Sequence, residues 1–407
     1  MIATLIPIFD DEMAVFGYSI FTQRDNFLLN PNLLGSGMLD GAGQIPGLDV
    51  VNSMGIDSLS EDKYIFVEVT NFSLFTDIKS LCDADPSRLI LLFDTSVQQS
   101  MEYLNRLKEL KSMGYGLAMR KLTPSNFGHY SEVLRLVDYA LLDHTKINIS
   151  SAKMFFERMF PQVTLCAVNV DTQEDYDKLR EVGGYHLYEG MFFRLPQVSG
   201  ERETAPLKAN YIQLLNVVND ADFDLTDAAD VISRDTALVI ELLKMVNHMT
   251  VNSEITSVRH AAAMLGQREL KRWINTAITR KLCADKPSEI TRLSLLRARF
   301  AENLADIFGL GGLSSELFLM GLFSVLDIIL DKPMEEALKT VKVSRSIENA
   351  LLRDTGDLAE VLDFMLEYEN ANWNEVDRQM VMKDIAMDQV YDAYLESLRW
   401  YRELLSA

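Results

Sequence analysis

Charged side chains stand at the ends of several short apolar runs in the first half of the sequence. Arg120 and Lys121 follow the run Gly116–Met119, and Asp143 follows the run Tyr139–Leu142. Two adjacent cationic side chains suit the binding of a phosphate. Carboxylates at strand ends can serve as oxygen ligands of hard divalent cations. The residue types are therefore compatible with phosphate binding, and the carboxylates are candidate cation ligands.

Other residues that could do chemistry lack a supporting pattern. None of the five histidines falls at metal-ligand spacing with another. The glycine-rich stretch Leu34–Gly43 lacks the Lys-Ser/Thr ending of a P-loop, so a surface loop is expected there. Cys82, Cys166 and Cys283 stand in apolar stretches and are expected to be buried, reduced thiols.

The elements that would position the charged residues alternate between strand and helix. Amphipathic segments such as Val97–Met113 separate runs rich in β-branched and aromatic residues. Repeated β-then-α units require right-handed crossovers and a mostly parallel sheet. About eight strands suit a closed TIM-like α/β barrel, with an open doubly wound sheet as the competing architecture. The expected strands are Thr4–Phe9, Val15–Phe21, Ile65–Val69, Leu89–Phe93, Gly116–Met119, Tyr139–Leu142, Thr164–Val168 and His186–Leu187.

The pattern changes near residue 200. Pro196 and the polar run Ser199–Thr204 end the strand signals, which predicts one domain at 1–200 and a second at 201–407. In the second, Asp224 precedes a helical apolar stripe and is expected to cap it. We expect an all-α helical bundle in this half. Further helices are expected around Val258–Leu265, Glu269–Ala277, Arg292–Ile307, Ser315–Leu330 and Met380–Leu405.

Composition limits the classes of partner. The 407 residues include 60 acidic residues against 39 Lys and Arg, a formal net charge of -21. Such a field repels nucleic acid and anionic membranes. No apolar run approaches the roughly 18 to 20 residues that span a bilayer, and Met1–Pro7 has no basic region typical of a signal peptide. We expect a cytoplasmic protein with no nucleic-acid partner and no membrane insertion.

The second half resembles the HDOD domain, a relative of the HD-GYP phosphohydrolases. The resemblance lies in Asp224–Asp235, in Leu242–Asn247 and in Ser257–Gly266, which track the family's acidic-capped helix, its "L-x-x-x-N" step and its "I-x-x-A-x-x-x-L-G" step. Where the HD family has its His-Asp dipeptide, this sequence has Ser324 and Val325. HDOD domains share that loss, so the resemblance implies no metal at these positions.

The first half is similar to the EAL domain, a barrel that hydrolyses cyclic di-GMP. Val15–Phe21 lies where the family has its Glu-Ala-Leu strand, Asp138–Asp143 where it has "D-x-x-K-x-D", and Leu187–Phe193 where it has "Q-G-Y-x-F". The order EAL then HDOD resembles a bacterial signalling architecture. The resemblance implies an EAL-type barrel followed by an HDOD-type bundle.

Most positions of the EAL metal site depart from the family pattern. Asp143 is retained, and Asp171 and Glu189 are near-matches. The departures are Ser19 for the motif glutamate, Glu68 for an asparagine, Leu91 for a glutamate, Arg120 and Lys121 for paired aspartates, Leu141 for a lysine and Val168 for a glutamate. Cationic groups at a metal site oppose divalent ions. From these departures we expect catalytically degenerate EAL and HD-type sites, no catalytic residue, no metal and no cofactor.

The resulting hypothesis is a non-enzymatic regulatory protein that acts through protein–protein contacts. The expected partners are proteins of a signalling pathway, such as cyclic di-GMP enzymes or sensor kinases, with a homodimer by analogy. Two alternatives stay open. One is a receptor that binds cyclic di-GMP without cutting it, and the other is a residual phosphodiesterase that uses Glu68, Asp94, Asp143, Asp171 and Glu189. Within the mouth of the barrel, Arg120 or Lys121 is expected either to pair with Asp143, Glu68 or Asp94, or to extend into solvent.

Overall fold

The computed structural model describes residues 1–26, 28–29, 43–194, 206–220, 222–249 and 255–406. These residues form two compact units. The first contains Met1–Leu195 with Phe364–Arg399, and the second contains Pro196–Asp363 with Trp400–Ala407. Nearly all of the glycine-rich stretch, and the predicted boundary between residues 200 and 201, lie outside the described residues. The division into domains 1–200 and 201–407 therefore stays a prediction from the sequence. Its bounds differ from those of the two compact units.

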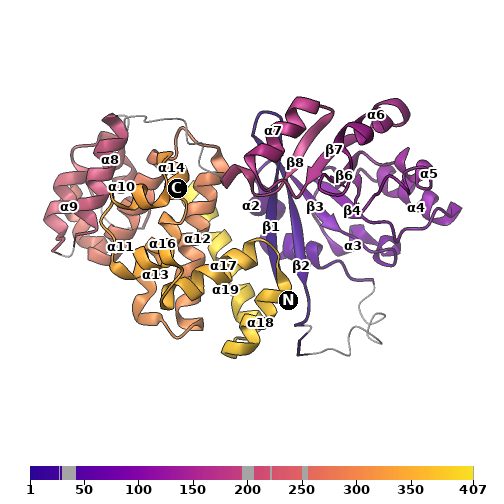
Figure 1. Cartoon of the computed structure of the whole chain (residues 1–407). Helices are drawn as coiled ribbons and strands as arrows, with labels where there is room; N and C mark the ends of the chain where they lie inside the picture. The colour runs from indigo at the N-terminus through magenta and orange to yellow at the C-terminus, as the bar shows by residue number, and fades with distance from the viewer. Residues whose placement is uncertain (27, 30–42, 195–205, 221, 250–254, 407) are drawn as a thin grey trace. The chain divides into compact units, whose positions relative to one another are not determined.

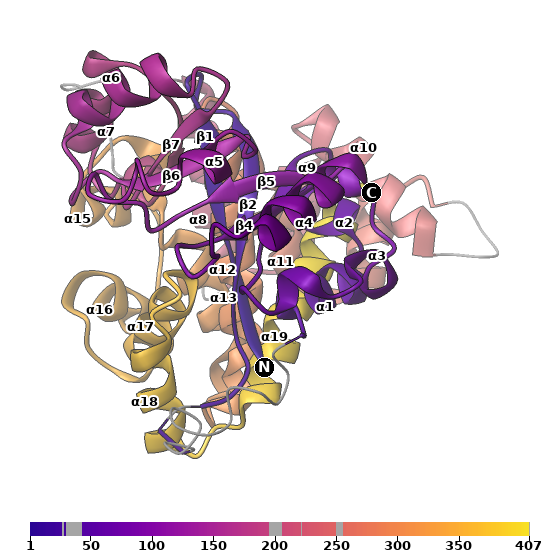
Figure 2. The same cartoon turned by 90° about the vertical axis from the view of Figure 1, so that its right-hand side faces the viewer.

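A closed barrel of eight strands forms the first unit, in the order β1 to β8 around the barrel. The strands can be followed from two sides in Figures 1 and 2. Each of the eight predicted strands is confirmed, and so is the predicted closed barrel. The strands are β1 Ile2–Asp10, β2 Val15–Gln23, β3 Tyr64–Glu68, β4 Leu89–Phe93, β5 Gly116–Met119, β6 Tyr139–Asp143, β7 Thr164–Val168 and β8 Tyr185–Glu189.

The first strand departs from an all-parallel barrel. β1 runs antiparallel to both β2 and β8, whereas each strand from β2 to β8 is parallel to the next. Only residues 11–14 connect β1 to β2. A parallel crossover needs about a dozen residues or more, so this short connection forces a hairpin. The later strands are joined through helices. These are α1 Pro46–Met54, α2 Ile56–Ser60, α3 Ile78–Leu81, α4 Met101–Ser112, α5 Ser131–Leu134, α6 Ile149–Met159 and α7 Gln173–Val182.

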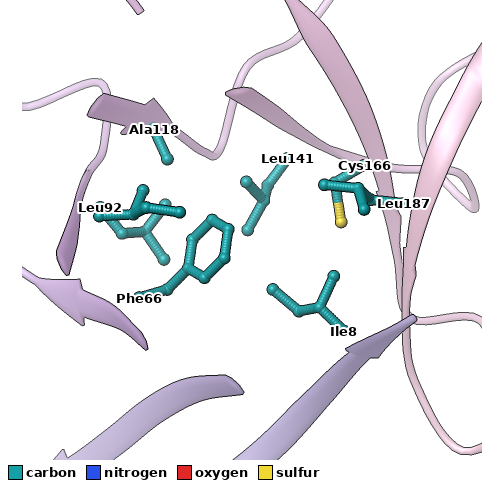
Figure 3. Close-up of a cluster of buried hydrophobic side chains, with 8 residues drawn as sticks. Ile8, Phe66, Leu92, Ala118, Leu141, Cys166 and Leu187 are labelled. Atoms are coloured by element: carbon teal, nitrogen blue, oxygen red, sulfur yellow. The ribbon is translucent and has the colours of Figure 1, made fainter. Parts of the chain in front are cut away.

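The interior of the barrel is a packed apolar core. Alternate residues of the strands point inward, because successive side chains of a strand lie on opposite faces. Figure 3 shows how these side chains converge, and they come from seven of the strands. Phe16, Tyr139 and Val168 pack against them and are partly buried. The cluster consists of Ile8, Phe66, Ile90, Leu92, Ala118, Leu141, Cys166 and Leu187.

The C-terminal part of the chain returns to the first unit and binds its first strand. It consists of the end of α17 Asp357–Glu369, of α18 Trp373–Lys383 and of most of α19 Met387–Ser406. Tyr368 exchanges two hydrogen bonds with the backbone of Ala3, and the Tyr394 hydroxyl accepts one from the Leu5 amide. These bonds occupy backbone groups on the edge of β1 that does not face β2, which would otherwise be open to pairing.

In the described ranges, nine complete helices precede this return and belong to the second unit. They are α8 Pro206–Val218, α9 Leu225–Ile232, α10 Thr236–Met249, α11 Val258–Leu282, α12 Ser288–Ile307, α13 Ser314–Phe323, α14 Leu326–Leu330, α15 Met334–Leu338 and α16 Arg345–Arg353. Asp224 caps α9 as predicted, since its carboxylate accepts hydrogen bonds from the amides of Thr226 and Asp227. Gly266 interrupts α11 with a φ of 75°, which explains why the sequence shows two helical segments there. The predicted all-α organisation is confirmed.

Two expectations drawn from composition can be compared with the fold. Cys82, Cys166 and Cys283 are all buried and free, as predicted. Within the described ranges, no helix combines the length and apolar character that a membrane crossing requires.

Candidate functional site

The carboxyl ends of the barrel strands carry a ring of inward-facing positions. A residue two places after an interior residue lies on the same side of its strand. Phe66 is an interior residue, so Glu68 at the end of β3 faces the barrel axis one step further along. The same two-residue step applies around the barrel, and on β7 it leads from Cys166 to the apolar Val168. We call the mouth layer the polar and charged residues of this ring, which are Ser19, Glu68, Asp94, Arg120, Asp143 and Glu189.

Arg120 and Glu68 form an ion pair across the mouth. The Arg120 Nη2 atom donates a hydrogen bond to Glu68 Oε1, and the side chains are 20% and 42% exposed. The guanidinium also lies 5.8 Å from the centroid of the Phe21 ring. The backbone amide of Arg120 donates to the Phe93 carbonyl at 2.9 Å, which fixes the start of this segment against β4. A cation thus occupies the mouth with a compensating carboxylate beside it.

Lys121 pairs with Asp94 at the rim. The Lys121 Nζ atom lies 2.7 Å from Asp94 Oδ2, and the lysine side chain is 61% exposed. Burial opposes ionisation of Asp94, but hydrogen bonds from Lys121 and Ser96 outweigh it and lower its pKa to about 2. Lys121 has a positive φ of 59°, which turns the chain sharply after β5. The ammonium is held by one carboxylate and still faces solvent.

Asp143 takes a different partner from those expected. Lys146 Nζ lies 2.7 Å from Asp143 Oδ2, and the Thr145 hydroxyl donates to Oδ1 at 2.6 Å. Burial again opposes ionisation, and these hydrogen bonds lower the pKa of Asp143 to about 2. The predicted pairing is therefore confirmed for Glu68 and Asp94, whereas Asp143 pairs with Lys146. Sequence reasoning missed Lys146, although its place three residues after Asp143 was the available signal.

Glu189 is the buried carboxyl of the mouth layer. The Ser19 hydroxyl donates to Glu189 Oε2 at 2.7 Å, across the intervening strand β1. Burial raises the pKa of Glu189, and the Ser19 hydrogen bond and the charge of Arg120 oppose that shift. The mouth-layer positions on β2 and β8 are thus joined by one hydrogen bond.

The remaining predicted positions do not join the mouth layer. Leu91 faces away from the barrel interior, because its neighbours Ile90 and Leu92 belong to the interior cluster. The structure gives the inward place on β4 to Leu92, a correction of one residue that follows from strand alternation. Leu141 is part of the buried core and Val168 packs against it. Asp171 is exposed in the segment after β7.

In the helical unit an arginine stands beside the HD-type position. The Ser324 hydroxyl donates to the Gly321 carbonyl at 2.7 Å and accepts from Arg297 Nη1 at 3.1 Å. Val325 is 1% exposed and packs as an apolar residue. Burial raises the pKa of nearby Asp327, and the charge of Arg297 lowers it less strongly. A guanidinium next to the dipeptide position makes this place unsuited to a cation.

The donor set does not fit a pair of divalent cations in the arrangement described. Across the residues that the structure describes, no three His, Cys, Asp or Glu side chains group closely enough to hold a metal ion. The carboxylates of the mouth layer instead accept hydrogen bonds from Arg120, Lys121, Lys146 and Ser19. A hard cation would have to displace these partners to gain its oxygen ligands.

The helical half is similar to a known domain family. Residues 205–355 match the model of the HDOD domain. The uncharacterized protein YuxH of Bacillus subtilis is 27% identical over 372 residues, which cover 88% of this chain and 89% of YuxH. The cyclic di-GMP phosphodiesterase CdgJ of Vibrio cholerae is 26% identical over 312 residues, which cover 75% of this chain and 72% of CdgJ. The predicted resemblance to EAL–HDOD signalling proteins is confirmed.

Solved structures match somewhat less than half of this chain. The PaMucR phosphodiesterase in its c-di-GMP complex is 16% identical, with a TM-score of 0.38, over 46% of this chain and 93% of that one. An EAL domain protein from Listeria monocytogenes is 16% identical, with a TM-score of 0.35, over 47% of this chain and 86% of that one. Because these scores are low, the barrel assignment rests on the strand order and register described above.

The expectation that this chain is not an enzyme is contradicted. CdgJ, matched over 312 residues, is named a phosphodiesterase. The expectation treated each departure from the EAL motif as a loss of activity. Carboxylates still stand at inward-facing positions at the ends of four strands, namely Glu68, Asp94, Asp143 and Glu189. Departure from the motif therefore does not establish degenerate sites.

Proposed function

We propose that this chain acts in cyclic di-GMP signalling and that its barrel binds the phosphates of a cyclic dinucleotide at the mouth layer. One observation carries the proposal. Arg120 and Lys121 stand together at the carboxyl end of β5, one facing the barrel axis and the other exposed at the rim. Guanidinium and ammonium groups are the side chains that bind phosphate oxygens. The carboxyl ends of the strands are also where barrel enzymes bind their ligands.

The electrostatics of the mouth make this binding selective. A phosphate must compete with Glu68 for Arg120 and with Asp94 for Lys121, since both cations are already paired. A ligand with two phosphates can bind both cations at once, and the two new contacts together compensate for the loss of both ion pairs. The raised pKa of Glu189 favours the neutral carboxyl, and a neutral carboxyl repels a phosphate less than a carboxylate does.

The resemblance supports a division of roles. CdgJ acts on cyclic di-GMP by name, and the HDOD match covers the helical unit. We propose that the helical unit acts through contacts with proteins of the same pathway, such as cyclic di-GMP enzymes or sensor kinases. We also propose that the protein forms a homodimer, which sedimentation of the full chain would test.

Calorimetric titration of the full chain with cyclic di-GMP tests the binding proposal. We expect Arg120→Ala to weaken binding about tenfold or more, because a charge-assisted hydrogen bond inside the mouth is lost. Lys121→Ala should weaken it less, since its ammonium is exposed. Arg135→Ala is the matched control, because Arg135 is an exposed, ion-paired arginine that precedes β6 at the opposite ends of the strands. Equal affinity for the wild type and Arg120→Ala, or no binding by the wild type, contradicts the proposal.

A second candidate function is hydrolysis of the same ligand. The name of CdgJ favours it. Incubation with cyclic di-GMP and Mg²⁺ or Mn²⁺, followed by chromatography, measures it directly. A linear dinucleotide that forms with the wild type and not with Glu189→Gln assigns hydrolysis to the mouth. Binding without a linear product rejects this second candidate and leaves the first intact.

A further inference from the structure

The helical unit contains a large groove that the proposed dinucleotide site does not use. Its volume is about 1350 Å³, and its walls come from α11, from the start of α13 and from the segment that includes α15 and α16. The helices α11, α13 and α16 can be found in Figure 1. Small-molecule pockets typically measure about 300–1,000 Å³, so this groove suits an extended ligand.

The charge of the groove differs from that of the whole chain. Six cationic and five anionic side chains line it, whereas the chain carries a net charge of -21. An acidic ligand is therefore repelled over most of the chain and much less here. The six cations are Arg268, Lys271, Arg272, Lys339, Lys342 and Arg353.

Most of the charges that line the groove are already paired, and Lys271 is an exception. Arg272 pairs with Glu302, Lys339 pairs with Glu335 at 2.8 Å, and Lys342 pairs with Asp220. Within the described part of the chain, no carboxylate lies at ion-pair distance from Lys271. Burial lowers the pKa of Lys271, and the charge of Asp220 only partly opposes this shift. A half-buried ammonium without a partner gains when an anion replaces its lost water.

One oxygen of another lining carboxylate also lacks a partner. Glu316 buries its Oε2 atom, and no donor among the described residues reaches it. Phosphate compounds offer oxygen acceptors and would leave this atom unsatisfied. A polypeptide offers backbone N–H donors together with acidic side chains. Glu316 and Lys271 therefore favour a polypeptide over a phosphorylated small molecule.

The groove also has apolar walls. Leu319, Leu338 and Leu352 line it beside the charged groups. Apolar surface next to a few polar groups is usual where proteins bind peptide segments.

We propose that this groove binds an acidic segment of a partner protein, with a carboxylate of that segment on Lys271 and a backbone amide on Glu316. The inference rests on the proposed role of the helical unit in protein contacts. It is independent of dinucleotide binding at the barrel mouth, because none of its residues belongs to the mouth layer.

Fluorescence anisotropy with a labelled Glu-Ala repeat peptide and the full chain tests the proposal. We expect the peptide to bind with an affinity that falls as the salt concentration rises. Lys271→Gln should lower this affinity about tenfold, whereas Lys271→Arg should retain most of it. Lys108→Gln is the control, because Lys108 is exposed on α4 of the barrel unit. A Gln-Ala repeat peptide should not bind.

Loss of folding is not expected to be the reason for weaker peptide binding by the variants. Lys271→Gln removes a charge that burial disfavours, so thermal unfolding should show no loss of stability. Arg268→Gln gives a second test from the same face of α11, where the side chain is 64% exposed. Equal binding by the wild type and both variants overturns the proposal. So does pyrophosphate binding that depends on Lys271 when the acidic peptide does not bind, because it assigns the groove to a phosphorylated ligand.

Cyclic di-GMP binding by the same variant shows whether the proposed site at the barrel mouth is affected. Calorimetry with cyclic di-GMP on Lys271→Gln should give the wild-type affinity. If peptide binding fails while dinucleotide binding persists, the inference about the groove is wrong and the proposed function of the mouth stands.

Discussion

The hydroxyl of Tyr368 is predicted to hold the first strand of the barrel in place. It accepts a hydrogen bond from the Ala3 amide at 3.3 Å and donates one to the Ala3 carbonyl at 2.8 Å. Both residues are 0% exposed. Tyr368→Phe keeps the ring and leaves two buried backbone groups without this partner. Each such group costs about 1–3 kcal/mol, so we expect β1 to be destabilised by at least about 2 kcal/mol.

Two other tyrosines calibrate this prediction. Tyr394→Phe removes the 3.3 Å bond from the Leu5 amide and should also destabilise β1. Tyr64→Phe is the control, because no residue in the described ranges hydrogen-bonds to the Tyr64 hydroxyl and its side chain is 37% exposed. Its effect should stay within about 0.5 kcal/mol.

Hydrogen exchange with mass spectrometry is the suitable assay, because a chain of two units need not unfold in one step. Peptides that cover β1 should exchange about 30-fold to several hundredfold faster in Tyr368→Phe than in the wild type. Exchange in β5 and β6 should change less. If β1 exchanges at the same rate in Tyr368→Phe and Tyr64→Phe, the hydroxyl does not stabilise the strand and the reasoning is refuted.

Three further predictions concern other parts of the molecule. Gly321→Ala would drive a methyl into the Arg297 carbonyl and should cost about 1–3 kcal/mol, whereas Gly312→Ala meets open space and should leave the melting temperature near the wild type. The pKa of Asp143 is depressed to about 2, so its stabilising contribution is complete above the ordinary value of 3.8 and disappears as pH falls toward 2. Lys146→Gln should raise that pKa, and an unchanged carboxyl titration by NMR would contradict the ion pair. The three cysteine thiols are buried with raised pKa values, so Ellman's reagent should label them slowly in the native protein and fully in urea; fast native labelling would show that they are accessible.

The sequence predicts elements better than it predicts which side chains meet. Strand periodicity located all eight barrel strands, and the cap at Asp224 was predicted correctly. It did not reveal that β1 runs antiparallel, which follows from the four-residue connection to β2. Leu91 was placed one residue away from the inward position because motif alignment ignores the alternation of side chains.

Long-range partners were largely beyond the sequence. Ser19 and Glu189 are 170 residues apart, and only closure of the barrel brings them to 2.7 Å. The return of Tyr368 and Tyr394 to β1 spans most of the chain and has no local signal. The inference that the chain is not an enzyme failed for a related reason, because it counted motif positions and not the carboxylates that the fold gathers at one end.

Hydrogen exchange with and without cyclic di-GMP tests the central claim most directly, because it locates the ligand. The account predicts slower exchange in the peptide that spans Arg120 and Lys121 and in the peptide that ends at Glu189. Protection in the helical unit alone, or no protection at saturating ligand, would contradict a dinucleotide site at the mouth of the barrel.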